Sequence, residues 1–173
     1  MDAMLENYRF LARYNTWFNA RLYDACEHLD DAARKAPRGA FFGSIHGTLN
    51  HLLWGDTMWL GRFAAQGEGL PADLLVLPAG AVYETELHTD WAALRTHRAR
   101  LDAAIEAWLA ALPADFPLRT MRYSNTKGVQ RAHPMWQALT HFFNHQTHHR
   151  GQVTTLLMQA GVDVGVTDLI ALV

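Results

Sequence analysis

Cysteine is almost absent from this chain of 173 residues: Cys26 is the only one, so no disulfide can form within the sequence. Such a composition is typical of a reducing compartment, and we expect a cytoplasmic protein. The first residues are acidic and lead into no short apolar segment, so no signal peptide is expected. No apolar run approaches the ~18 residues that would predict a transmembrane helix.

Charged residues are also few, at 18% of the chain, and the formal net charge is −2. A chain so weakly charged lacks the basic surface that binds nucleic acid, so neither a nucleic acid nor a membrane is expected as a partner. The sequence contains no repeat, no low-complexity tract and no obvious linker. Its length and its apolar content therefore predict one globular domain over residues 1–173.

Several motifs of known metal and nucleophile chemistry are missing. The sequence has no His-Glu-x-x-His, which excludes the usual zinc protease, and no Glu-x-x-His, which leaves a di-iron carboxylate site unsupported. A single cysteine excludes the closed zinc sites that are built from two or four thiolates. Neither a Gly-x-Ser-x-Gly sequence nor a phosphate-binding loop is present.

Four long segments carry apolar residues at the spacing of a buried helix face, with Gly and Pro between them. They span residues 2–29, 44–66, 84–112 and 134–160. Ser44 suits the N-cap of a helix, Pro134 suits a first turn, and Gly161 suits a C-terminal stop. Four long helices with their apolar faces inward predict an all-α protein with the four-helix bundle fold.

The remaining stretches are expected to connect or cover these helices. Residues 67–83 are predicted to form a long loop. Residues 118–123 and 128–133 flank a turn sequence and predict a short hairpin before the last helix. The apolar tail over residues 162–173 is expected to pack on the bundle as a short helix.

The last predicted helix carries four of the ten histidines within nine residues. His145 and His149 are four residues apart, so they lie on one face of the helix, one turn from each other. A helical wheel places both beside the buried face, whereas His141 and His148 lie farther out, at the rim. Two imidazoles in this arrangement can bind one metal ion, and a third ligand from another helix would complete an open site.

The third ligand cannot be chosen by periodicity. The helix predicted over residues 44–66 holds two histidines, His46 and His51, and it is apolar nearly all round. His51 shares a stripe with Trp54, whereas His46 lies near the start of the helix, where it could cap the helix or face solvent. Spacing alone leaves both residues as candidates.

Five residues near these histidines are further candidates for a role. Asp56 lies among apolar neighbours, where an unpaired carboxylate is costly, so it predicts a buried pair with an arginine or an indole N–H, with a catalytic carboxylate as the alternative. Arg150 is a candidate partner for Asp56, or a group that binds an anionic substrate. Gln152 could orient a metal ligand or face the substrate. Gly151 suggests the close approach of another helix, including one across a dimer contact. Tyr123 is a candidate for the mouth of the site.

Three segments resemble the DinB family, also described as DinB/YfiT-like metalloenzymes. They are residues 14–22, residues 44–56 and, most specifically, residues 145–152, which read HQTHHRGQ and are followed by matches at 161–163 and 168–169. The resemblance implies a four-helix bundle with a three-histidine metal centre. By position in the motifs, its ligands would be His51, His145 and His149.

The resemblance also implies a function. Proteins similar to this family in fold and triad use low-molecular-weight thiols in transfer or isomerisation, so we expect a metal-dependent enzyme of the thiol-transfer type. The alternatives are a hydrolase that uses metal-bound hydroxide and a non-catalytic metal-binding protein of a stress response. Ligation by nitrogen alone suits zinc, nickel, iron or copper and does not choose among them. We expect zinc or nickel first, with iron as a further candidate.

A homodimer is expected partly from the family's habit and partly from apolar surface. More apolar residues are present around the second predicted helix than its one buried face in a bundle can cover. They are Trp54, Met58, Trp59, Phe63 and residues 74–77. A two-fold contact is the common way to cover such surface. The alternative is that the 67–83 loop and the C-terminal tail cover it within one chain.

Overall fold

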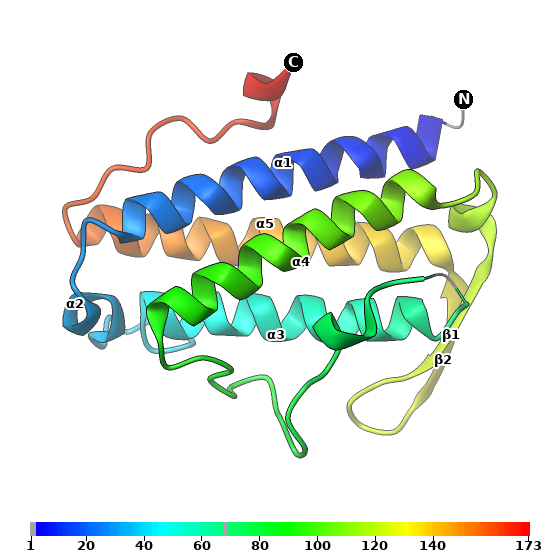
Figure 1. Cartoon of the computed structure of the whole chain (residues 1–173), viewed down its shortest axis with the longest axis horizontal. Coiled ribbons are helices and arrows are strands. Elements are labelled where there is room, and N and C mark those ends of the chain that lie inside the picture. The colour runs from blue at the N-terminus through cyan, green and yellow to red at the C-terminus, as the bar shows by residue number, and fades with distance from the viewer. Residues whose placement is uncertain (1–2, 68) are drawn as a thin grey trace.

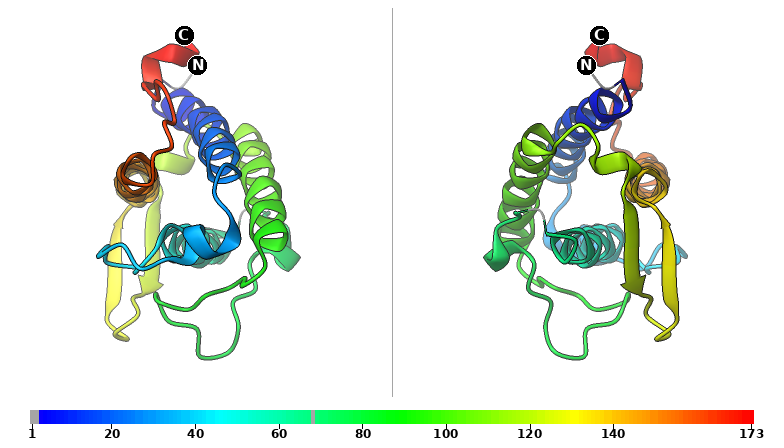
Figure 2. Two further views of the ribbon diagram at one scale, coloured as in Figure 1. Left: turned by 90° about the vertical axis from the view of Figure 1, so that its left-hand side faces the viewer. Right: turned by 90° about the vertical axis from the view of Figure 1, so that its right-hand side faces the viewer.

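A computed structural model describes residues 3–67 and 69–173, and these form five α-helices and one two-stranded antiparallel sheet. The helices are α1 (Ala3–Cys26), α2 (Asp31–Lys35), α3 (Ile45–Ala64), α4 (Trp91–Ala111) and α5 (Met135–Gln159). The strands are β1 (Thr120–Ser124) and β2 (Gln130–Pro134). The four long helices lie side by side, and seen end-on each occupies its own corner (Figures 1 and 2). The predicted, mostly helical fold is confirmed.

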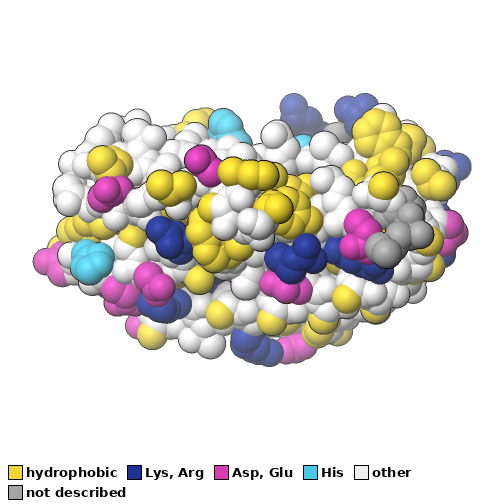
Figure 3. Space-filling model, turned by 90° about the horizontal axis from the view of Figure 1, so that it is seen from above, with side chains coloured by type: hydrophobic (Ala, Val, Ile, Leu, Met, Phe, Trp, Pro, Cys, Tyr) yellow, Lys and Arg dark blue, Asp and Glu magenta, His cyan; other side chains and the backbone are white. Residues whose placement is uncertain are grey.

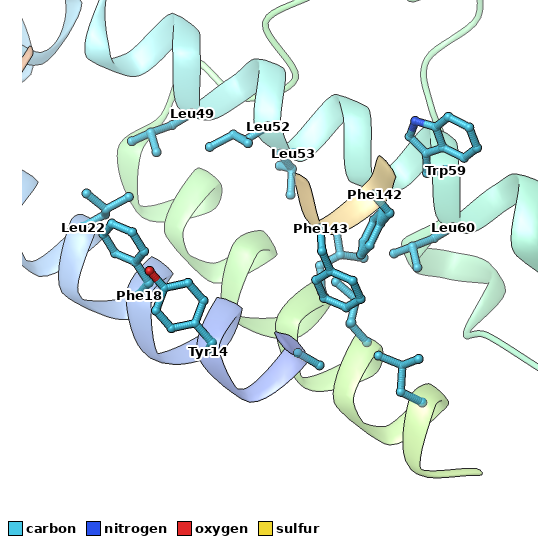
Figure 4. Packing of buried hydrophobic residues seen from close by; sticks show 14 of the residues in the cluster. Tyr14, Phe18, Leu22, Leu49, Leu52, Leu53, Trp59, Leu60, Phe142 and Phe143 are labelled. Atoms are coloured by element: carbon cyan, nitrogen blue, oxygen red, sulfur yellow. The ribbon is translucent and has the colours of Figure 1, made fainter. Parts of the chain in front are cut away.

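The core lies between the long helices. α1 packs on α4 and on α5, and α5 packs on α3. Figure 4 shows apolar side chains of α1, α3 and α5, most of which point into the space between the helices, whereas Trp59 lies on another side of α3. Its labels mark Tyr14, Phe18, Leu22, Leu49, Leu52, Leu53, Trp59, Leu60, Phe142 and Phe143, all of which are buried. Each fully buried Leu or Phe contributes about 1.5–3 kcal/mol to folding, so this cluster holds the helices in register.

Local signals set several helix ends where the sequence predicted them. The Ser44 hydroxyl oxygen accepts a hydrogen bond from the backbone N–H of Gly47 at 2.9 Å, which caps α3. After α5, Gly161 has a φ of +82°. This conformation lets the N–H of Val162 reach the carbonyl of Leu157 at 2.9 Å and closes the helix.

The start of α4 was predicted seven residues too early, at 84 instead of at Trp91. The Asp90 side chain accepts a hydrogen bond from the N–H of Ala93 and fixes the start there. Ahead of it, Asn50 on α3 holds the chain in an extended path, because its side chain exchanges two hydrogen bonds with the backbone of His88, at 2.9 and 3.1 Å. The backbone N–H and carbonyl of His88 thus bond to a side chain of α3 and not within a helix of their own.

The short helix α2 was not predicted. It is one turn long and is capped by Asp30, whose side chain accepts from the N–H of Ala33 at 2.7 Å. Arg34 within it is buried and donates to the carbonyl of Cys26 at 3.2 Å. α2 therefore ties the end of α1 to the segment that leads into α3.

The predicted hairpin is confirmed, whereas the predicted packing of the tail as a short helix is found only in part, because Val162 and Val164 are buried but most of the tail is exposed coil. β1 and β2 pair in antiparallel register, with Thr120 opposite Pro134. The tail runs back along α1 and ends in a single 3-10 turn (Figure 1). The Tyr14 hydroxyl donates to the carbonyl of Thr167 at 2.5 Å, and Arg21 donates to the carbonyl of Val164 at 3.1 Å. Figure 3 views this side of the molecule, where hydrophobic side chains lie among basic and acidic ones.

The apolar surface that suggested a dimer is mostly covered within one chain. Trp54, Trp59, Phe63 and Leu74 are buried, and Leu75 packs against the core. The loop after α3 therefore covers much of this apolar surface, which was the alternative to a dimer. Among the helices of residues 3–67 and 69–173, none is both long enough and apolar enough to cross a membrane.

Candidate metal centre

Three histidines meet between α3 and α5. His51 comes from α3, and His145 and His149 come from successive turns of α5. One ring nitrogen from each lies within 4.8 Å of the other two, so the three residues could hold a metal ion. The Nε2 atoms of His51 and His145 are 3.1 Å apart. Two nitrogens on a tetrahedral zinc ion are separated by roughly 3.3 Å, so this spacing fits shared coordination.

Hydrogen bonds orient two of the three rings. The Nδ1 atom of His51 lies 2.8 Å from the carbonyl oxygen of Tyr83, which can only accept, so Nδ1 carries the proton and donates. The Nδ1 atom of His149 donates in the same way to the side-chain oxygen of Gln152, at 2.7 Å. Each bond leaves Nε2 with a free lone pair that can bind a metal. Gln152 therefore takes the orienting role, one of the two that the sequence suggested.

The surroundings keep the triad uncharged. Burial lowers the pKa of His51. Burial, together with the neighbouring histidines, lowers the pKa of His145 to about 3. Burial is also the main reason that the pKa of His149 falls to about 4. All three imidazoles are thus neutral near pH 7, which is the form that binds metal ions.

Aromatic rings close one side of the triad. The ring of Phe42 stacks on His51 with centroids 3.7 Å apart, and it meets His149 edge-on at 5.5 Å. The ring of Trp54 stacks near His51 at 6.0 Å. These apolar walls limit the access of water to the nitrogens, which strengthens electrostatic interactions there. Phe42 was not predicted from the sequence, because it lies outside any helix and nothing in its spacing connects it to the triad.

A pocket of about 310 Å³ opens beside His145. Its walls come from α3, α5, the hairpin and the loop before α4. They comprise Trp54, Gly55, Met58, Trp59, Arg62, Tyr83, Tyr123, Asn125, Thr126, His141 and His145. His141 thus lies at the rim of the site, as the helical wheel predicted, and Tyr123 lines the mouth. His148 lies on a different side of α5, where it lines a separate hollow with Gln152.

Gly55 on α3 leaves room for His145. A Cβ atom at this position would lie 2.7 Å from Cε1 of the His145 ring, too close for both to stay in place. We expect Gly55→Ala to keep the fold, because the ring can swing away, but to weaken metal binding about 10- to 100-fold. The measurement is a metal titration alongside circular dichroism.

Gly61, two turns farther along α3, provides the matched control for this substitution. No atom lies within 4 Å of the position that its Cβ would take. Gly61→Ala should leave metal affinity unchanged and raise the free energy of unfolding by about 1 kcal/mol, since alanine favours a helix. Equal metal affinities of the two variants would contradict the role assigned to Gly55.

The predicted buried pair of Asp56 is present, but its partner is Arg98 and not Arg150. Nη1 of Arg98 lies 2.6 Å from the Asp56 carboxylate, and both side chains are buried. Arg150 is buried elsewhere, where it donates to the side chain of Asn15 and lies over the ring of Phe18 at 4.8 Å. The side chain of Arg150 reaches α1, where Asn15 accepts its hydrogen bond, whereas Arg98 of α4 donates to Asp56.

The positions of His46 and Gly151 answer two further questions that the sequence left open. The Nε2 atom of His46 lies 2.8 Å from the carbonyl oxygen of His88, away from the triad, so His51 is the histidine of α3 that meets α5. Gly151 is exposed, and within the described part of the chain no atom lies near the position of its Cβ. The close helix approach expected at Gly151 is therefore not found within this chain.

Comparisons with known proteins agree with the geometry. A family model described as the DinB family matches residues 4–172. The chain is also similar to Protein DinB of Bacillus subtilis (strain 168), with 27% identity over 159 residues, which are 91% of this chain and 88% of that protein. No solved structure gives a significant match.

Proposed function

The chain belongs to the DinB family, and on that premise we propose that His51, His145 and His149 bind one divalent metal ion at the active site of a thiol-transfer enzyme. The observation that carries the proposal is the convergence of three neutral imidazoles from two helices. In this proposal the four long helices form the four-helix bundle of one domain.

The three histidines fit a divalent ion. Two of them present Nε2 lone pairs fixed by hydrogen bonds to Tyr83 and Gln152, and all three are neutral. Three protein ligands leave at least one coordination position open, as in catalytic sites. All-nitrogen ligation suits zinc, nickel, iron and copper alike, and of these we propose zinc or nickel. When bound, such an ion would act as a Lewis acid and favour the ionised form of a thiol or of water.

The protein's own residues supply binding and orientation but no nucleophile for thiol chemistry. The only cysteine, Cys26, is fully buried, and burial raises the pKa of its thiol to about 12. A thiol that reacts at this site must therefore come from solution. The pocket beside His145 has the size of a small-molecule site, which supports a low-molecular-weight thiol and its acceptor as substrates.

Activity should appear only in metal-loaded protein that is given both a thiol and an electrophile. In the expected reaction the thiolate sulfur bonds to the electrophilic carbon, and the leaving group departs with its electron pair. The measurement is loss of electrophile with the zinc- or nickel-loaded protein, with the His51→Ala/His145→Ala/His149→Ala variant as control. Ester or amide hydrolysis without thiol would favour the hydrolase instead. Activity no greater than that of the control in both assays would favour a non-catalytic, stress-related metal-binding role.

The proposal also includes a cytoplasmic location and a homodimeric state. A cytoplasmic location is supported by the free, buried Cys26. The homodimer stays a prediction based on family resemblance, because Trp59, Phe63 and Leu74 are already buried within one chain. A dimer contact would have to use other surface.

A further inference from the structure

Arg62 lines the pocket that opens beside His145, and no described carboxylate lines that pocket with it. We infer that its guanidinium binds a negatively charged oxyanion, a carboxylate or sulfonate, on the substrate that reacts at the histidines. The inference rests on the proposed function and adds to it the chemical class of the substrate.

The position of Arg62 places it and His145 in one pocket. Gly55, Met58 and Arg62 lie on successive turns of α3, and all three line the pocket of about 310 Å³ that His145 and His141 line from α5. A small molecule in this space could reach the metal site with one end and Arg62 with the other. The hairpin encloses the pocket on the side of Tyr123.

Aromatic rings hold the guanidinium without using its donors. Its central carbon lies 4.7 Å from the ring centroid of Trp59 and 4.6 Å from that of Tyr123. Both contacts are with the faces of rings, which attract a cation but accept no conventional hydrogen bond. The side chain is half-buried, and burial lowers the pKa of Arg62, so the cation has lost part of its hydration.

No carboxylate compensates this charge among the described residues. Arg95, Arg98 and Arg100 each form an ion pair with an aspartate or glutamate at 2.6–2.9 Å, whereas Arg62 forms none. The pocket walls include neither Asp nor Glu, so Arg62 is the one fully charged side chain among the described residues that line it. A planar guanidinium with free N–H donors is the group that best recognises a planar carboxylate.

The test compares matched thiols on cobalt-loaded protein. Binding of 3-mercaptopropionate, of 2-mercaptoethanesulfonate and of the neutral 3-mercapto-1-propanol is followed through the sulfur-to-cobalt absorption band. We expect the two acids to bind roughly 10- to 100-fold more tightly than the alcohol, as is usual for a hydrogen bond to a charged group. The relative affinity of the two acids shows which oxyanion Arg62 prefers.

Arg62→Gln should remove this preference and leave the affinity for the alcohol unchanged. Arg131→Gln is the matched control, because Arg131 is exposed on β2 and its removal changes the net charge equally. Equal binding of acids and alcohol to the natural protein, or a preference that survives in Arg62→Gln, would overturn the inference.

A metal-free arm separates this inference from the proposed function. In protein without metal, the Nε–H NMR signal of Arg62 should shift on addition of 3-mercaptopropionate and not of the alcohol. A shift in protein that takes up no cobalt would uphold Arg62 as an anion site while refuting the metal enzyme. Normal cobalt uptake with no shift and no preference for acids would refute only the role of Arg62.

Discussion

Replacing His51 with alanine is expected to reduce metal binding from about one divalent ion per chain to almost none. His51 is the only member of the triad that α3 supplies. Without it, the ion would be held by His145 and His149 alone, from one helix, and the remaining positions would be filled by water. The measurement is the metal content of tag-free protein after reconstitution with zinc or nickel and removal of the unbound ion.

His46→Ala is the matched control for this experiment. His46 lies on the same helix and is also buried, but its Nε2 atom contacts the carbonyl of His88 and the carboxylate of Glu86 at 2.8 and 2.9 Å. This variant should keep its metal. Metal retained in His51→Ala, or lost only in His46→Ala, would show that the ion binds elsewhere.

The sequence alone predicts two of the three histidines of the triad and their common helix face. His145 and His149 are four residues apart on a strongly patterned helix, so their common face follows from the helical repeat. The choice of His51 does not follow in this way, because α3 is apolar nearly all round and presents no single buried stripe. Which face of α3 meets α5 depends on contacts between distant residues, and only the family resemblance selected His51 beforehand.

The hydrogen-bond partners of His149 and His51 also differ in whether the sequence could predict them. Gln152 could be proposed from sequence because it lies one turn from His149 on the same helix. The partner of His51 is a backbone carbonyl, that of Tyr83, in a loop more than thirty positions away along the chain. Every residue has such a carbonyl, so no residue type marks it. Only the folded path of the loop brings it to the site.

Helix boundaries show why local patterns are not sufficient. Ser44 and Gly161 act within one turn of the helices that they end, and their predictions were right. The start of α4 was wrong because Asn50 bonds to the backbone of His88, a contact across 38 positions. Asp90 was nevertheless a local signal for the true start, since an aspartate is among the best N-cap residues.

A buried polar network fixes how α3 and α5 sit against each other. Asp56 of α3 accepts hydrogen bonds from Arg98 of α4 and from Gln146 of α5. Nη2 of Arg98 lies 2.7 Å from Asp102, which in turn accepts from Asn19 of α1 at 3.0 Å. All five side chains are buried. Two charged residues four apart on an apolar helix face, as Arg98 and Asp102 are, were a signal in the sequence that could have revealed this network.

The network also positions the three histidines of the candidate metal centre. Asp56 directly follows Gly55, which makes room for the ring of His145, and Gln146 directly follows His145. The bond between Asp56 and Gln146 therefore holds the two helices at the level where the histidines meet. Burial raises the pKa of Asp56, and the charge of Arg98 opposes that rise, so the carboxylate depends on its partner to remain ionised.

Asp56→Ala is expected to lower the free energy of unfolding by about 3–5 kcal/mol. The substitution leaves Nη1 of the buried Arg98 guanidinium without an acceptor and also removes the acceptor of Gln146, and buried donors that lose their partners are costly. The measurement is denaturant unfolding of the metal-free protein, so that loss of metal does not contribute. Asp24→Ala is the control, because Asp24 pairs with Arg95 at 2.6 Å on the surface, where such a pair contributes about 1 kcal/mol or less. If the two variants lost similar stability, the network would be a minor contributor, and the alignment of α3 with α5 would have to come from the apolar core alone.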